Sequence, residues 1–90
     1  MHMYTILYIL YSNGAKSKLV AATQKQIQDA LEADGEKLCD RTVYNNIRKL
    51  ANKGFIAEGL LHGNAKSYYV TTAGISWMRE IEAEVNEDEQ

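Results

Sequence analysis

The sequence predicts a small α+β domain that is mostly helical, with a core of three helices followed by a β-hairpin and a C-terminal helix. Three observations support this fold class. Apolar residues recur at helical spacing in four segments of the 90-residue chain. The first three segments each end close to a glycine, at Gly14, Gly35 and Gly54. Between the third and fourth segments the spacing changes to the alternation of strands, interrupted by a Gly-Asn turn.

The length and composition describe one globular domain. Charged residues make up 24% of the chain and apolar residues 46%, which is ordinary for such a domain. No apolar run approaches the roughly 20 residues that cross a membrane, and no signal-peptide pattern is present. The single cysteine, Cys39, fits a reducing compartment. We therefore expect a cytoplasmic protein with no membrane partner, in which residues 1–85 form the domain and residues 86–90 an acidic, frayed tail.

The first predicted helix lies at Tyr4 to Tyr11, where seven of eight residues are apolar or aromatic. On a helix, Tyr4, Tyr8 and Tyr11 form one stripe and four aliphatic residues spread over the other side. A helix that is apolar all round is buried on more than one side. In so small a domain, a second subunit would cover the tyrosine stripe most simply. The alternatives are a β-strand, or tyrosines that lie on the surface with hydrated hydroxyl groups.

The second predicted helix follows a basic loop at residues 14–18 and a very short strand at residues 19–22. Thr23 and Gln26 have the spacing of a capping box, in which each side chain binds the backbone N–H of the other residue. Gly35 is expected to end the helix. Its buried edge consists of Ile27, Ala30 and Leu31.

The third predicted helix, at about residues 40–53, organises the rest of the chain. Asp40 is expected to cap its N-terminus, and Gly54 supplies the left-handed residue that ends it. A strand follows immediately. Two short helices joined by a turn, the second of them basic, form a helix-turn-helix arrangement. The stripe that faces the core consists of Val43, Ile47, Leu50 and Ala51.

The opposite face of this third helix carries cations and amides but no acidic residue. The chain has a net charge of −2, yet Lys37 to Lys53 holds five cations and one acid, because six of the twelve acids lie between Arg79 and Gln90. Such a helix suits the major groove of DNA. The alternative is an ordinary solvated polar face. The residues of this face and its flanks are Arg41, Thr42, Tyr44, Asn45, Arg48, Lys49 and Asn52.

The predicted hairpin spans residues 55–70, with His62, Asn64 and Lys66 at its tip. A hairpin directly behind a groove helix is a wing, which could lie on the DNA backbone or in the minor groove. Lys66 is the best candidate for a wing contact.

The final predicted helix is capped by Thr71 and ends near Glu84. Trp77 lies off its apolar stripe, and we expect Trp77 to complete an interface with a partner. The stripe consists of Ile75, Met78, Ile81 and Val85.

The segment from Thr42 to Ile56, followed by Ser67 to Gly74, resembles the winged helix-turn-helix transcriptional regulators of the PadR type. It is similar, less closely, to the DNA-binding domains of MarR and ferric-uptake regulators. The shared pattern is Thr-hydrophobic-Tyr at the start of the recognition helix, Lys-Gly-hydrophobic-Ile at its end, and a wing that ends in Tyr-x-hydrophobic-Thr-x-x-Gly. The matching residues are Thr42, Val43, Tyr44, Ile47, Leu50, Lys53, Gly54, Ile56, Tyr68, Val70, Thr71 and Gly74.

The resemblance implies a repressor-like homodimer that binds double-stranded DNA sequence-specifically. The helix at about residues 40–53 would then enter the major groove, and the wing at about residues 55–70 would contact the backbone or the minor groove. The implied DNA contacts are Arg41, Thr42, Tyr44, Asn45, Arg48, Lys49 and, on the wing, Lys66. The dimer interface is expected at Tyr4, Tyr8, Tyr11 and Trp77.

An alternative function is that of a winged-helix protein-interaction module or accessory subunit that does not read DNA. The acidic net charge supports this alternative, as does the apolar surface expected to be exposed at Tyr4 to Tyr11 and Trp77. An enzyme is not expected, because the sequence has no nucleophile motif near a histidine and no glycine-rich phosphate loop. Cys39, His2 and His62 lack metal-ligand spacing, so we expect neither a metal nor a cofactor.

Overall fold

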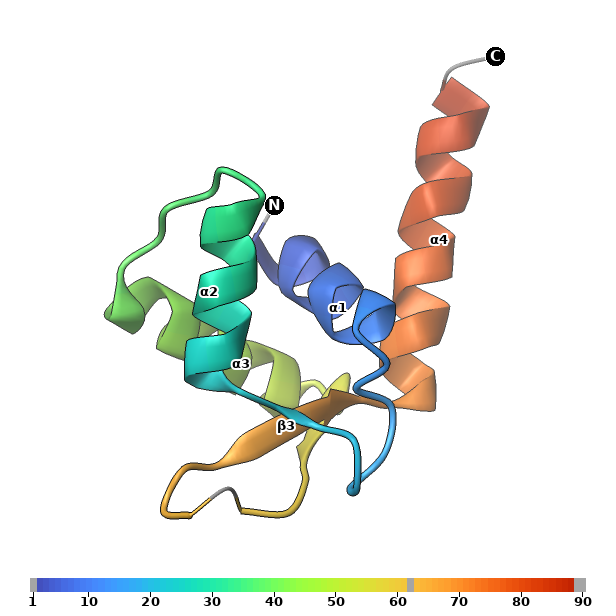
Figure 1. The fold of residues 1–90 in the computed structure, drawn as a ribbon. Helices are drawn as coiled ribbons and strands as arrows, with labels where there is room; N and C mark the ends of the chain where they lie inside the picture. Colours follow the sequence, from blue (N-terminus) through green and yellow to red (C-terminus); the bar gives the residue numbers. More distant parts are fainter. Residues whose placement is uncertain (1, 62, 89–90) are drawn as a thin grey trace.

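The structure, a computed structural model, describes residues 2–61 and 63–88, without the side chains of residues 85–88. His62 at the predicted wing tip and the side chain of Val85 therefore lie outside the described residues. The predicted order of four helices and a hairpin is confirmed (Figure 1). In chain order the elements are α1 (His2–Ser12), β1 (Ala22–Thr23), α2 (Gln24–Ala33), α3 (Asp40–Asn52), β2 (Ile56–Glu58), β3 (Ser67–Val70) and α4 (Thr72–Asp88).

Helix α1 lies at the centre of the molecule, in contact with α2, α3, β3 and α4 (Figure 1). Its four aliphatic side chains are buried, so the expected helix that is covered on more than one side is confirmed. Much of this cover comes from the chain itself, because α4 packs along α1. The buried residues of α1 are Ile6, Leu7, Ile9 and Leu10.

The start of α2 carries the predicted capping box. The backbone N–H of Gln26 donates to Thr23 Oγ1 at 3.2 Å, and the backbone N–H of Thr23 donates to Gln26 Oε1 at 2.9 Å. Thr23 also pairs with Ser67 across the sheet. The expected strand at residues 19–22 is wrong in position, since β1 covers only Ala22 and Thr23. One residue thus ends a strand and begins a helix.

Replacing Thr23 by alanine is expected to lower the free energy of unfolding by about 1 kcal/mol, because the backbone N–H of Gln26 loses its acceptor oxygen at the helix start. Thr23→Ser keeps the acceptor oxygen and should retain most of this stability. Urea denaturation of both variants provides the measurement. Equal midpoints for wild type and Thr23→Ala would show that the cap contributes nothing to stability.

The buried stripe of α3 consists of Val43, Ile47 and Leu50. The expectation that Ala51 is also buried is wrong, because Ala51 is exposed. Successive residues of a helix lie about 100° apart, so Ala51 turns away from Leu50 and toward the wing. The predicted end of the helix is confirmed: Gly54 has a φ of +79°, in the left-handed region that glycine adopts without steric cost.

The start of α3 differs from the prediction that Asp40 caps the helix. Cys39 occupies the cap position, and its side chain makes no cap hydrogen bond. Asp40 is the first helical residue, and its carboxylate instead accepts a hydrogen bond from Gln28 Nε2. The carbonyl of Asp40 accepts from Gln24 Nε2 at 3.0 Å. Side chains of α2 therefore fix the start of α3, which is a tertiary interaction that local spacing does not reveal.

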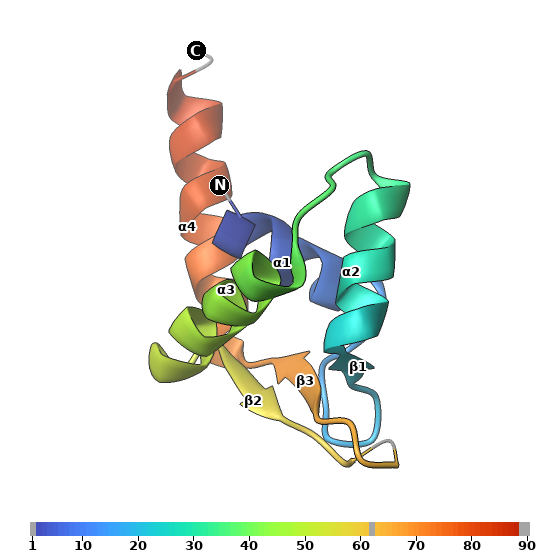
Figure 2. The ribbon, with the colours of Figure 1, turned by 90° about the vertical axis from the view of Figure 1, so that its left-hand side faces the viewer.

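The three strands form an antiparallel sheet in the order β1-β3-β2. Ile56 pairs with Val70 and Glu58 with Tyr68. Thr71 then caps α4 as predicted, since the N–H of Gly74 donates to Thr71 Oγ1 at 3.2 Å. Helix α4 extends beyond the expected end near Glu84, and its last turns project past the other helices (Figures 1 and 2).

No helix in the described part of the chain is long and apolar enough to cross a membrane.

Candidate nucleic-acid interface

Helix α3 lies next to the wing (Figure 2), and its polar face is exposed. Its buried stripe holds it against the core, and the bonds from α2 to Asp40 fix its N-terminal end. Most of the predicted DNA-binding residues are therefore presented outward from a rigid element. The exposed ones on α3 are Arg41, Tyr44, Asn45, Arg48 and Lys49.

Thr42 is the exception, since its side chain is half-buried. Its Oγ1 lies 3.1 Å from Cys39 Sγ, and its carbonyl accepts from Asn46 Nδ2 at 2.8 Å. The hydrogen bond with the Thr42 hydroxyl is the main cause that lowers the pKa of the Cys39 thiol. Thr42 thus contributes to the start of the helix, and its hydroxyl is less free than the predicted role of a direct DNA contact suggests.

Tyr44 and Arg48 form a pair one helical turn apart. Arg48 Nη1 donates to Tyr44 Oη at 3.1 Å, and the guanidinium carbon lies 5.8 Å from the centre of the tyrosine ring. The hydrogen bond and the positive charge of Arg48 lower the pKa of the Tyr44 hydroxyl. This pairing restricts a long side chain that would otherwise be mobile. The guanidinium is presented with most of its donors still available.

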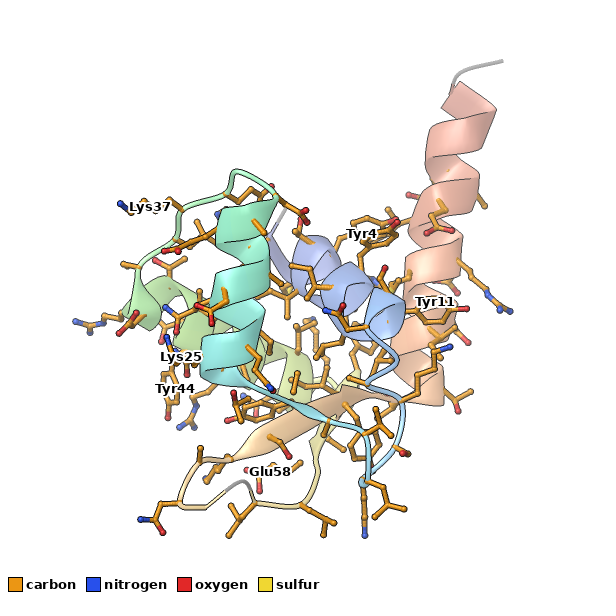
Figure 3. The ribbon with its side chains drawn as sticks, viewed as in Figure 1. Tyr4, Tyr11, Lys25, Lys37, Tyr44 and Glu58 are labelled. Carbon is orange, nitrogen blue, oxygen red and sulfur yellow. The ribbon has the colours of Figure 1, made fainter. Side chains whose placement is uncertain are left out.

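A cleft of about 400 Å³ separates this pair from the wing. Lys66 lies on its far side, where its Nζ is 3.5 Å from Glu58 Oε1. Figure 3 shows Tyr44 on α3 and Glu58 below it on the wing. The structure thus brings Lys66 of the wing and the α3 residues Tyr44 and Arg48 around one cleft. The described residues that line it are Tyr44, Ile47, Arg48, Ala51, Asn52, Glu58, Lys66 and Tyr68.

Glu58 and Tyr68 belong to this site although the sequence did not indicate them. They are cross-strand partners, so their side chains lie on the same face of the sheet, which is the face toward α3. Burial of Tyr68 raises the pKa of its hydroxyl, and the charge of Glu58 raises it further. In the sequence, these residues were marked only by the alternation within the hairpin. That alternation does not tell which residues face α3 unless the strand register is known.

The three tyrosines predicted to form the dimer interface lie together on α1 (Figure 3 labels Tyr4 and Tyr11). The rings of Tyr4 and Tyr8 stack with their centres 6.3 Å apart. Tyr4 Oη donates to Glu82 Oε1 of α4 at 2.8 Å, which raises the pKa of Tyr4. The Lys16 ammonium lies 4.2 Å from the centre of the Tyr11 ring. Tyr8 is the most exposed of the three, at 50%.

Trp77, the fourth predicted interface residue, is placed elsewhere. Its ring stacks on Phe55 at the entry to the wing, with the ring centres 5.1 Å apart and an interplanar angle of 23°. Trp77 is therefore half-buried by its own chain, where the sequence suggested an exposed side chain.

The described residues contain no group of three or more His, Cys, Asp or Glu side chains that could hold a metal ion.

Comparisons with known proteins identify the fold. No protein-family model and no curated protein matches the chain. A solved PadR-like transcription factor from Bacteroides fragilis is similar with a TM-score of 0.80 and 23% identity, over 97% of this chain and 82% of that chain. A mutant of Staphylococcus aureus MepR is similar with a TM-score of 0.78 and 25% identity, over 99% of this chain and 59% of that chain.

A structure of S. aureus MepR in complex with DNA is also similar, with a TM-score of 0.71 and 26% identity over 98% of this chain. The chain spans 65% of that MepR chain. These neighbours are regulators, in agreement with the expectation that the chain is not an enzyme. The resemblance inferred from the sequence is thus confirmed, and the chain has the winged helix-turn-helix fold of the PadR-like and MepR transcription regulators.

Proposed function

We propose that the chain is a transcription regulator that binds double-stranded DNA sequence-specifically as a homodimer and represses by occupying its operator. The observation that carries this proposal is the exposed face of α3, which presents cations and amides and no acid, in a fold that MepR uses in a complex with DNA. Because α3 is held against the core on its other side, this face can enter a major groove without rearrangement of the domain.

The proposed contacts divide into two classes. Arg48 and Lys49 bind backbone phosphates, and Lys66 on the wing does the same from the other side of the cleft. Asn45 is an exposed amide near the middle of α3, and it has the donor and acceptor that an adenine edge requires. Arg41 lies in the first turn, where recognition helices commonly approach base edges.

The proposed homodimer rests on a separate argument. One winged helix reads only a few base pairs, whereas two copies related by a two-fold axis read two half-sites about 34 Å apart. The half-exposed Tyr8 beside the α1–α4 seam offers an aromatic surface for a second copy. The backbone of the last turns of α4 projects beyond the body of the domain, where a second copy can reach it (Figures 1 and 2).

Replacing Arg48 and Lys49 together by alanine is expected to weaken binding to any duplex by roughly 10- to 100-fold at about 0.1 M salt. The slope of log affinity against log salt should fall by about two units, because two phosphate contacts are lost. Fluorescence anisotropy with a labelled duplex of mixed sequence, titrated with salt, measures both quantities.

The matched control is the double variant Lys16→Ala, Lys18→Ala, which removes the same charge from the loop before β1. It should bind DNA within about threefold of wild type if local contacts, and not net charge, carry the affinity. Wild-type affinity in the Arg48, Lys49 variant would exclude the assignment of α3 to the major groove.

The second candidate function is the protein-interaction module. The observation that favours it is an exposed aliphatic patch on two neighbouring loops, joined where the N–H of Leu60 donates to the carbonyl of Lys18 at 3.2 Å. A wild-type protein that binds no duplex, even at low salt, would favour this function over DNA binding. The patch consists of Leu19, Val20, Leu60 and Leu61, each more than half exposed.

A further inference from the structure

The cleft between α3 and the wing contains several groups that are suited to binding an anion. Beside them lies one carboxylate. Arg48 and Lys66 contribute the positive charges, and Tyr44 contributes a hydroxyl. Among the described residues of the lining, Glu58 is the one acid, and its carboxylate faces the Lys66 ammonium at 3.5 Å. An acid is unexpected at this position, because the neighbouring face of α3 carries none.

Strand register holds Glu58 in this position independently of Lys66. Glu58 pairs with Tyr68, whose buried ring forms part of the cleft, and cross-strand partners share one face of a sheet. The neighbouring pair, Ala57 and Tyr69, faces the other side. Glu58 therefore points toward α3 because of where it stands in β2. The ion pair is a consequence of this placement, since Lys66 lies in the hairpin loop, one residue before β3 begins.

A carboxylate and a phosphate compete for the same kind of partner. Lysine binds either anion as a point charge, and the arginine fork donates two N–H groups to either one. Both side chains of the Lys66–Glu58 pair are largely exposed, so the pair is weak and water screens it. A phosphate that enters the cleft meets Arg48 and Tyr44 on one side and can take Lys66 from Glu58 on the other.

We propose that Glu58 is an intramolecular competitor for backbone phosphate: it occupies Lys66 in the free protein, and one DNA phosphate displaces it when the duplex binds. The inference rests on the proposed function and names a regulating residue within that site. The displaced carboxylate remains beside the bound phosphate and repels it. This cost applies to every duplex, because a phosphate contact carries no sequence information. Glu58 thereby lowers the general affinity for DNA and leaves base readout on α3 unaffected.

The test compares wild type with Glu58→Gln in anisotropy titrations with a mixed-sequence duplex. Glutamine keeps the size of the side chain and removes its charge. The expected result is a 3- to 10-fold rise in affinity at about 0.1 M salt, with a log–log salt slope steeper by up to about one unit. Circular dichroism and a thermal scan check that the exposed substitution leaves the fold intact.

Glu32→Gln is the matched control, because it makes the same charge change at an exposed position in the last turn of α2, at the opposite end from the sheet. It should bind DNA within about twofold of wild type. An equal rise in Glu32→Gln would overturn the inference in favour of an effect of net charge. Unchanged affinity in Glu58→Gln, with wild type binding normally, would overturn the inference alone.

A second background separates displacement of the ion pair from simple repulsion. In a Lys66→Ala protein, Glu58→Gln should raise affinity by less than half of its effect in wild type, because no lysine is left to release. An equal effect in both backgrounds would overturn the role of Lys66. If neither wild type nor any variant shows salt-dependent binding, the proposed function itself is wrong, and this inference with it.

Discussion

Replacing Gly74 by alanine is expected to lower the free energy of unfolding by about 1–3 kcal/mol, although alanine normally favours a helix over glycine by about 1 kcal/mol. A Cβ at this position would lie 2.3 Å from the carbonyl oxygen of Phe55 and 2.9 Å from Val70 Cγ2. The Phe55 carbonyl has little freedom to move, because it accepts the N–H of Thr71 at 3.0 Å. The N–H of Phe55 in turn donates to Leu50 at the end of α3.

Gly54→Ala is the informative comparison, because the two glycines are constrained by different physics. A Cβ at Gly54 would meet nothing within 4 Å, but its φ of +79° disfavours any side chain. We expect a cost of about 1 kcal/mol there, from the backbone conformation alone. Urea denaturation should therefore rank wild type above Gly54→Ala, and Gly54→Ala above Gly74→Ala. A Gly74→Ala protein as stable as wild type would show that α4 does not pack closely on the entry to the wing.

The sequence could predict those parts of the fold that depend on residues close together in the chain. The capping box at Thr23 and the helix end at Gly54 depend on residues within one turn, and both predictions are confirmed. The cap at Asp40 was predicted from equally good local chemistry but is wrong. Gln24 and Gln28, which engage Asp40, lie 16 and 12 residues away on another helix. The local preference of an aspartate for the cap position is overridden where a tertiary hydrogen bond engages the same carboxylate.

The candidate site divides in the same way. The outward face of α3 followed from the helical period, and the structure confirms that Arg48, Lys49 and Asn45 are exposed. The cleft could not be predicted from the helical period, since it depends on the strand register of the hairpin and on where the hairpin packs. Glu58 joins the site only through its pairing with Tyr68. Trp77 likewise depended on a contact between distant segments, because Phe55 covers it 22 positions away along the chain.

Tyr8→Glu is expected to give a folded monomer and to lower affinity for a palindromic site by about 100-fold or more. The loss has that size because two linked half-sites bind with an effective concentration that a monomer lacks. Tyr8 is the appropriate position on α1, since its side chain is half exposed, whereas Tyr4 is tied to Glu82 and Tyr11 packs beneath Lys16. A carboxylate at Tyr8 would have to lose its hydration inside an apolar interface.

Tyr8→Phe is the matched control, because it keeps the ring that stacks on Tyr4 and removes only the hydroxyl. Sedimentation equilibrium at micromolar concentration should show wild type and Tyr8→Phe as dimers and Tyr8→Glu as a monomer with an unchanged circular dichroism spectrum. A dimeric Tyr8→Glu protein would place the interface elsewhere on the chain. A wild-type protein that stays monomeric, both free and on DNA, would contradict the homodimer and leave each α3 to read a single half-site. Mixed-sequence DNA provides the last distinction: Tyr8→Glu should bind it with nearly the salt slope per chain of wild type, because the phosphate contacts of α3 and the wing remain in place.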